Sequence, residues 1–230
     1  MTVYLASPCS QMQAASVESM PVLISFALWS PWLERYVPSF GQLLLDSGAY
    51  SAHTTGTKVD LAKFAEFAER FRGLADAVAS LDSISGDWRE GWRNMEAMPD
   101  GLGFPTFHDS DPPELLDDLI SAAQERGGWI GVGLVPETRH LRGRWLKETL
   151  DRMPPELHVH GWACRRFWNS HRRLDSVDST NWTLDGRKVL DACPWLTPAE
   201  ATEIVVKRYR RERRTLPSIE TPSLFAGEEA

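Results

Sequence analysis

The sequence predicts an α/β fold in which about eight strands and the helices between them form a parallel (β/α)8 barrel of the TIM type. Short apolar runs alternate with segments of helical periodicity along most of the chain. The length of 230 residues is close to what a compact barrel needs. An open, doubly wound sheet is the alternative, although the chain has neither the G-x-G-x-x-G fingerprint nor a P-loop.

The expected strands are apolar runs of five to seven residues, rich in Val, Ile, Leu and Phe. Segments with a helical pattern lie between them, so the strands are expected to run parallel to one another. In chain order the runs occupy residues 3–7, 22–28, 42–48, 76–82, 103–108, 129–133, 157–163 and 174–180.

The expected helices are recognised by apolar spacing and by residues that cap helices. The stretch 59–73 carries apolar side chains at helical spacing, and Asp60 is placed to cap it. Asp87 is placed to begin the next helix. A last helix is expected over 197–214, with Thr197 as its N-cap and proline at its first position.

One domain is expected over residues 1–215, followed by a flexible tail over 216–230. The apolar run 21–29 is too short to cross a bilayer, and nothing resembles a signal peptide. The three cysteines are far apart, which argues against a disulfide framework or a zinc knuckle. These features indicate a cytoplasmic protein that does not associate with membranes.

Charge is distributed unevenly along the chain. The net charge is −7, yet residues 139–214 contain 17 Lys and Arg against 10 Asp and Glu. A basic run is usually a solvated helix face, but three clusters in one half, two of them mixed with aromatics, favour a polyanionic partner. The residues expected to hold DNA phosphates are Arg139, Arg165, Arg166, Arg210 and Arg211.

Ionisable side chains stand where five of the expected strands end. They are Asp46, Asp82, His108, His160 and Asp178. In a parallel barrel the carboxyl ends of the strands meet at one face, and active sites lie there. Three carboxylates near one mouth raise one another's pKa, which suits acid, base and nucleophile roles. The sequence therefore predicts an active site at this face.

Several short motifs carry a resemblance to a known family. The motif DSGAY (46–50) resembles the DSGG(F/Y) motif of the tRNA-guanine transglycosylases, barrel enzymes that exchange a base by breaking its N-glycosidic bond. Four further motifs match in the same order along the chain: SLD (80–82), GWIGVG (128–133), HVHGW (158–162) and SVDST (176–180). The likeness spans most of residues 43–182.

The resemblance implies a role for each matched position. Asp178 is expected to be the nucleophile that attacks C1′ of the sugar, and Asp46 to handle protons or orient the incoming group. Tyr50 is expected to stack on the base, and Asp82 to hydrogen-bond to its edge. The other residues expected to contact the flipped base are Gly131, Gly133 and Gly161 at strand ends, His108 and His160 as donors, and Trp182 as an aromatic clamp.

The sequence also departs from that family. The zinc subdomain with its closely spaced cysteines is absent, and STNW (179–182) replaces the P-T-R segment after the nucleophile. The chain is more similar to a compact branch from phages and bacteria that acts on DNA. The resemblance therefore implies a DNA glycosylase that needs no cofactor and leaves an abasic site, or alternatively a transglycosylase that inserts a deazaguanine-type base.

Two other functions fit parts of the sequence. His158 and His160 lie two apart on one strand, so both point the same way, and with Asp178 or His108 they could hold zinc or manganese in a barrel hydrolase. A non-catalytic nucleic-acid binder would need only the basic half of the chain, but it leaves the carboxylates at the strand ends unexplained.

Overall fold

The computed structural model describes residues 1–83, 86–133, 142–162, 164 and 171–214. Within them, eight strands form one sheet in the order β4-β3-β2-β1-β8-β7-β6-β5, and neighbouring strands pair in parallel. The strands are β1 Thr2–Ala6, β2 Pro21–Ser25, β3 Gln42–Asp46, β4 Ala77–Val78, β5 Thr106–His108, β6 Trp129–Gly133, β7 His158–Gly161 and β8 Ser176–Ser179. Each lies within or beside an expected run.

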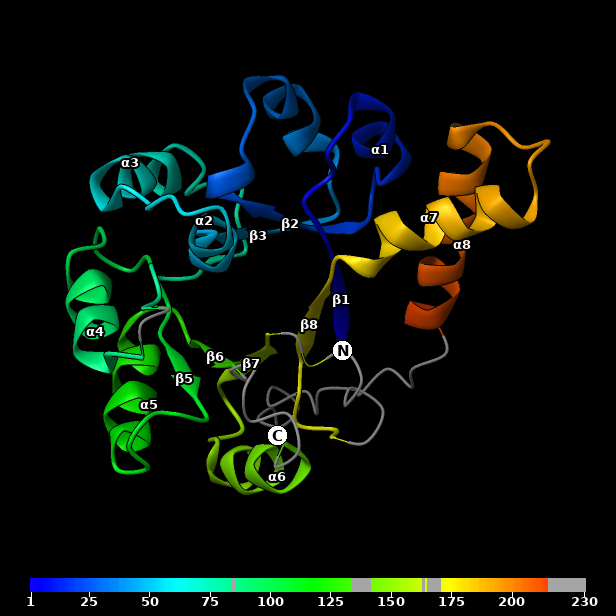
Figure 1. Cartoon of the computed structure of the whole chain (residues 1–230). Coiled ribbons are helices and arrows are strands. Elements are labelled where there is room, and N and C mark those ends of the chain that lie inside the picture. The colour runs from blue at the N-terminus through cyan, green and yellow to red at the C-terminus, as the bar shows by residue number, and fades with distance from the viewer. Residues whose placement is uncertain (84–85, 134–141, 163, 165–170, 215–230) are drawn as a thin grey trace, which may run out of the picture.

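The two edge strands of this sheet, β4 and β5, are joined by a parallel bridge between Ala79 and Phe104. The N–H of Phe104 donates to the carbonyl of Val78 at 2.8 Å, and the N–H of Ser80 donates to the carbonyl of Phe104 at 3.0 Å. The sheet therefore curls round on itself, with helices on its outer side (Figure 1). The predicted (β/α)8 barrel is confirmed, and the open-sheet alternative is wrong.

The helices begin where the capping residues predict. Asp60 accepts from the N–H of Lys63 at 3.2 Å, and Thr197 and Glu200 form a reciprocal capping box. None of the helices that the structure describes is long and apolar enough to cross a membrane. The helices are α1 Gln11–Ser16, α2 Ala49–Thr54, α3 Leu61–Arg70, α4 Trp88–Glu96, α5 Leu115–Glu125, α6 Arg142–Arg152, α7 Asn181–Ala192 and α8 Pro198–Arg214, with 3-10 helices at Phe26–Leu28 and Pro31–Ser39.

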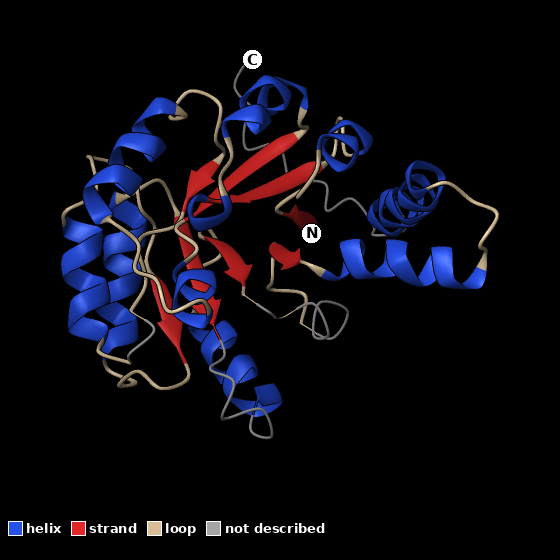
Figure 2. Cartoon of the chain, turned by 45° about the horizontal axis from the view of Figure 1, so that its top comes forward, coloured by secondary structure: helices blue, strands red, loops and turns tan. Residues whose placement is uncertain are grey.

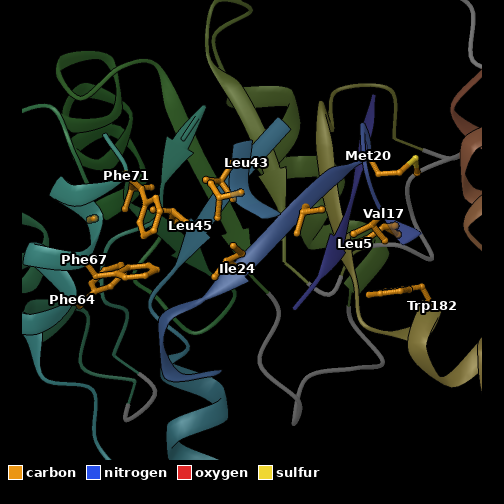
Figure 3. Packing of buried hydrophobic residues seen from close by; sticks show 14 of the residues in the cluster. Leu5, Val17, Met20, Ile24, Leu43, Leu45, Phe64, Phe67, Phe71 and Trp182 are labelled. Carbon is orange, nitrogen blue, oxygen red and sulfur yellow. The ribbon is translucent and has the colours of Figure 1, made fainter. Parts of the chain in front are cut away.

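Side chains of each strand alternate between the helix layer and the barrel interior, as the period of two requires. Outward-facing residues of β2 and β3 pack against the phenylalanines of α3 (Figure 3). Inward-facing residues fill the middle of the barrel, among them Tyr4, Leu23, Leu44 and Phe104. Above this apolar layer the next inward positions are polar, and they form the site described below.

Helices α7 and α8 pack against each other and extend to the side of the barrel (Figure 2). These two helices follow β8 in the chain, and together with α1 they cover the outer side of β8 and β1. The tail predicted over 216–230 lies outside the described residues.

Candidate active site

A pocket of about 600 Å³ opens at the carboxyl ends of the strands. Four of the predicted ionisable residues line it: Asp46 from β3, Asp82 from the loop after β4, His108 from β5 and Asp178 from β8. Its volume lies in the range of about 300–1,000 Å³ that ligand pockets occupy. Aromatic side chains complete its walls, namely Tyr50 from α2, Trp88 and Trp92 from α4, and Trp162 just after β7.

The DSGAY motif forms the turn that presents Asp46 to the pocket. Gly48 has a φ of 76°, a left-handed conformation that favours glycine, and a Cβ there would lie 2.2 Å from Oγ of Ser25. The backbone N–H of Gly48 donates to Oδ2 of Asp46 at 3.0 Å. Tyr50 lies in the first turn of the following helix, α2, and is 58% exposed at the pocket mouth. The motif therefore places a carboxyl group inside the pocket and an aromatic ring at its rim.

Asp46 holds its proton at a higher pH than an ordinary carboxyl group. Burial raises the pKa of Asp46 to about 7, and the negative charges of Asp178 and Asp82 act in the same direction. The hydrogen bond from Gly48 partly opposes this shift. Near neutral pH this carboxyl group can therefore either give or take a proton.

His108 lies between two carboxylates. Its Nε2 is 2.9 Å from Oδ2 of Asp82, and its Nδ1 is 3.6 Å from Oδ2 of Asp111. Burial by itself lowers the pKa of His108, but the charge of Asp82 and the hydrogen bonds to Asp111 and Asp82 outweigh it and raise the pKa to about 10. The imidazole is thus a cation at neutral pH, and it fixes the orientation of Asp82 in the pocket.

His160 lies beneath Asp178 rather than in the pocket wall. It is fully buried, and its Nε2 is 3.8 Å from Oδ1 of Asp178. Its Nδ1 is 2.9 Å from Oγ of Ser176, which is also 2.9 Å from Nε2 of His158. The ring of Trp162, two residues further along the chain, packs edge-on against His160 and lines the pocket in its place. The expectation that His160 contacts the base is therefore wrong.

Two of the three predicted glycines allow side chains to pack inside the barrel. A Cβ on Gly131 would lie 2.5 Å from Nε1 of Trp162, and one on Gly133 would lie 2.7 Å from the His108 ring. Gly133 also lines the pocket. Gly161 faces the other way, towards Cys164 in the helix layer, so its predicted contact with the base is wrong.

The predicted role of Trp182 as a clamp on the base is also wrong. The side chain is 1% exposed and packs beside Leu5 and Val17 in the cluster under the helices (Figure 3). Its indole N–H donates to the carbonyl of Ala6 at 3.0 Å. A residue at the start of α7 faces the barrel wall, since the helix must bury one face against β1 and β8.

The basic residues that the structure describes do not gather at the pocket. Arg210 donates from Nη2 to the carbonyl of Glu18 at 2.9 Å, in the turn that leads into the beginning of β2. This is the opposite end of the barrel from the pocket, and the contact of Arg210 with DNA phosphates stays a prediction. Arg211 is exposed on the same helix. Arg139, Arg165 and Arg166 lie outside the described residues.

The metal alternative finds no donor set in the described part of the chain. No group of three His, Cys, Asp or Glu side chains there is placed to hold a metal ion. His158 and His160 do point the same way, as predicted, but both rings contact the hydroxyl of Ser176.

Sequence reasoning missed several polar residues of this region, among them Asp111, Ser176 and Ser25. Asp111 follows His108 by three positions, and Ser176 precedes Asp178 by two, so strand and turn spacing was the available signal. Ser25 ends β2 beside Asp46, lines the pocket, and has no hydrogen-bond partner for its buried Oγ among the described residues.

The fold and site thus define a parallel barrel with a carboxylate-lined pocket at the carboxyl ends of its strands. No protein-family model matches the chain, and no curated protein matches its sequence. Solved structures that are similar at a low level include the YdjI aldolase from Escherichia coli K12 and the carboxyl transferase domain of pyruvate carboxylase from Rhizobium etli with 3-hydroxypyruvate.

The aldolase is 8% identical with a TM-score of 0.42, over 93% of this chain and 90% of that one. The carboxyl transferase domain is 15% identical with a TM-score of 0.43, over 91% of this chain and 47% of that one. Likeness at this level carries no argument about function. The resemblance to the tRNA-guanine transglycosylases rests on the sequence motifs.

Proposed function

We propose that this chain is a DNA glycosylase that cleaves the N-glycosidic bond of a flipped nucleobase, with Asp178 as the nucleophile and Asp46 as the proton donor. The observation that supports it is a pair of carboxyl groups in one pocket, of which Asp46 has a pKa of about 7. Glycosidic bonds are cleaved with retention by such a pair, one member acting as nucleophile and the other as acid and then base.

The reaction has two balanced steps. In the first, an oxygen of Asp178 bonds to C1′ while the C1′–N bond breaks, its electron pair goes to the base, and Asp46 gives that base a proton. In the second, water attacks C1′, Asp46 takes a proton from this water, and the carboxylate of Asp178 leaves. The products are the free base and an abasic site, and both aspartates return to their starting states.

The rest of the pocket supports binding of a base. Asp82, held by His108, can accept a hydrogen bond from an N–H group on the base edge. Tyr50 is exposed at the rim, where an aromatic ring can stack on a base that has left the duplex. The basic clusters of the sequence would contact the phosphates, which puts this task on residues such as Arg165 and Arg166.

The test is release of a base from DNA. The purified protein is incubated with unmodified DNA and with phage DNA carrying modified bases, released bases are identified by mass spectrometry, and abasic sites are detected by alkaline strand cleavage. We expect base release without added metal, insensitivity to EDTA, and loss of release with Asp178→Asn. Loss of activity in EDTA would favour the hydrolase built on His158 and His160, and DNA binding without any release would favour the non-catalytic binder.

The base-exchange alternative shares the first step and differs only in what attacks C1′ afterwards. Adding a labelled deazaguanine-type base to the same reaction distinguishes the two. Incorporation of the label without abasic sites would establish exchange, whereas abasic sites without incorporation establish hydrolysis.

A further inference from the structure

Below the pocket, beneath Asp178, three side chains form a hydrogen-bonded chain that the reaction above does not use. Ser176 and His160 are register partners on β8 and β7, and the hydroxyl of Ser176 lies 2.9 Å from Nδ1 of His160 and 2.9 Å from Nε2 of His158. His158 is stacked on Trp129, with the ring centroids 3.6 Å apart. The hydrogen bonds therefore connect His158 through Ser176 to His160, which lies beneath Asp178.

His160 is buried completely, and its Nε2 has no hydrogen-bond partner among the described residues. A buried polar atom without a partner is costly, so such an atom usually serves a specific purpose. Among the described residues, the carboxylate oxygen Oδ1 of Asp178 lies 3.8 Å from this nitrogen, which is about 1 Å beyond an ordinary hydrogen bond. A rotation of the Asp178 side chain that shortened this distance by about 1 Å would bring the two atoms into hydrogen-bond range.

The hydroxyl of Ser176 decides which nitrogen of His160 carries the proton. A serine hydroxyl has one hydrogen, so it donates to one of the two histidines and accepts from the other. If it donates to Nδ1 of His160, the N–H of that ring is on Nε2 and points at Asp178. The opposite arrangement would direct a lone pair at a carboxylate, which electrostatic repulsion disfavours.

The neutral state of His158 completes this arrangement. Burial lowers the pKa of His158 to about 4, and the neighbouring His160 and Arg173 also lower it, against the charge of Asp175. A neutral His158 has one N–H, which it can donate from Nε2 to Ser176. Donation then runs in one direction, from His158 through Ser176 to His160 and on to Asp178.

We propose that His160 is a positioning residue for Asp178, held by Ser176 with its proton on Nε2, and that this N–H binds one oxygen of Asp178 so that the other faces C1′. The assignment of Asp178 as a nucleophile rests on the proposed function, whereas the proton position of His160 does not. During the covalent step the same N–H would hold the carbonyl oxygen of the glycosyl ester.

The first test measures the proton position by nuclear magnetic resonance on protein with ¹⁵N-labelled histidine. We expect His160 protonated on Nε2, a shift of the Nε2 and Hε2 signals in Asp178→Asn, and a mixture of the two neutral forms in Ser176→Ala. Ser179→Ala is the matched control. Ser179 lies on the same strand, but its hydroxyl is 3.2 Å from that of Tyr209 and takes no part in the hydrogen bonds between His158, Ser176 and His160. The proposal is overturned if His160 carries its proton on Nδ1, or if its Nε2 and Hε2 signals do not shift in Asp178→Asn.

The second test uses base release from DNA. We expect His160→Phe to lower kcat about 10- to 100-fold with KM nearly unchanged, and His160→Gln, which keeps a donor near Nε2, to recover most of it. Equal kcat in the Phe and Gln variants, with both folded by circular dichroism, overturns the positioning role. If the wild-type protein releases no base, the proposed function fails, and the magnetic resonance result still decides where His160 carries its proton.

Discussion

The backbone N–H of Gly48 donates to Oδ2 of Asp46 at 3.0 Å, so the glycine that turns the chain after β3 also orients the carboxyl group in the pocket. The same glycine approaches Ser25 and Ala27 too closely for any side chain. One short turn therefore combines a left-handed backbone, a tight contact between neighbouring strand ends, and the placement of a candidate catalytic group. This relationship leads to the first prediction.

Gly48→Ala is expected to destabilise the protein by roughly 1–3 kcal/mol and to reduce base release, because a Cβ meets Ser25 and the φ of 76° is strained for alanine. Two glycines serve as controls. Gly56→Ala meets the strain alone, since its φ is +70° with nothing within 4 Å, and Gly73→Ala meets neither. Urea denaturation should rank the loss as Gly48, then Gly56, then Gly73, and any other order contradicts the role given to the turn.

Asp178→Asn is expected to lower the rate of base release by roughly 10³-fold or more, on the order of 4 kcal/mol, because the amide keeps the shape but loses the charge that stabilises the developing cation. Folding and DNA affinity should stay close to those of the wild type. Single-turnover assays on modified DNA give the rate, and a gel-shift titration gives the affinity. If Asp178→Asn keeps its activity, Asp178 is not the nucleophile.

The rate of base release is expected to fall as the pH rises through about 7. Asp46 must carry its proton to act as the acid, and its pKa is about 7 because of burial and the charges of Asp178 and Asp82. The pH profile of single-turnover rates measures this. Asp46→Asn should release base more slowly, and its rate should not fall as the pH rises through about 7. If the rate still falls in this variant, a group other than Asp46 causes the fall.

His158 is expected to make folding stability fall in acid. Its pKa is lowered from 6.5 to about 4, so between these values the unfolded chain binds a proton that the folded protein does not. The stability is present above pH 6.5 and is lost as the pH falls, by roughly 2 kcal/mol between about pH 7.5 and pH 5.

Urea denaturation at both pH values measures this loss, and comparison with His158→Gln separates it from the contributions of Asp46 and His108. The variant should lack that part of the acid loss. The same acid loss in wild type and His158→Gln would show that His158 is not a buried neutral base.

Replacing Arg165 and Arg166 together by Ala is expected to weaken DNA binding and to reduce the slope of log affinity against log salt by roughly 1–2, because each phosphate contact releases a counterion. Arg210→Ala is the comparison. Its guanidinium contacts the turn before β2 at the far end of the barrel, so DNA affinity should not change. Fluorescence anisotropy at several salt concentrations tests both, and the reverse pattern would place the DNA at that far end.

The barrel and the face that carries the pocket follow from patterns that are local in the sequence. Alternating apolar runs and helical stretches indicate parallel strands, and in a parallel barrel every strand ends at the same face. For that reason the order of residues along the chain is enough to place Asp46, Asp82, His108 and Asp178 together, and all four line the pocket.

How deeply a side chain is buried, which way it points and what its pKa is depend instead on how distant segments of the chain pack. His160 and Asp178 both sit near strand ends, yet one is buried beneath the pocket and the other lines it, because strands of a barrel are staggered along its axis. Trp182 and Gly161 face the helix layer, and Arg210 lies at the far end. The pKa of Asp46 likewise depends on burial and on charges from other strands, which neighbours in sequence do not specify.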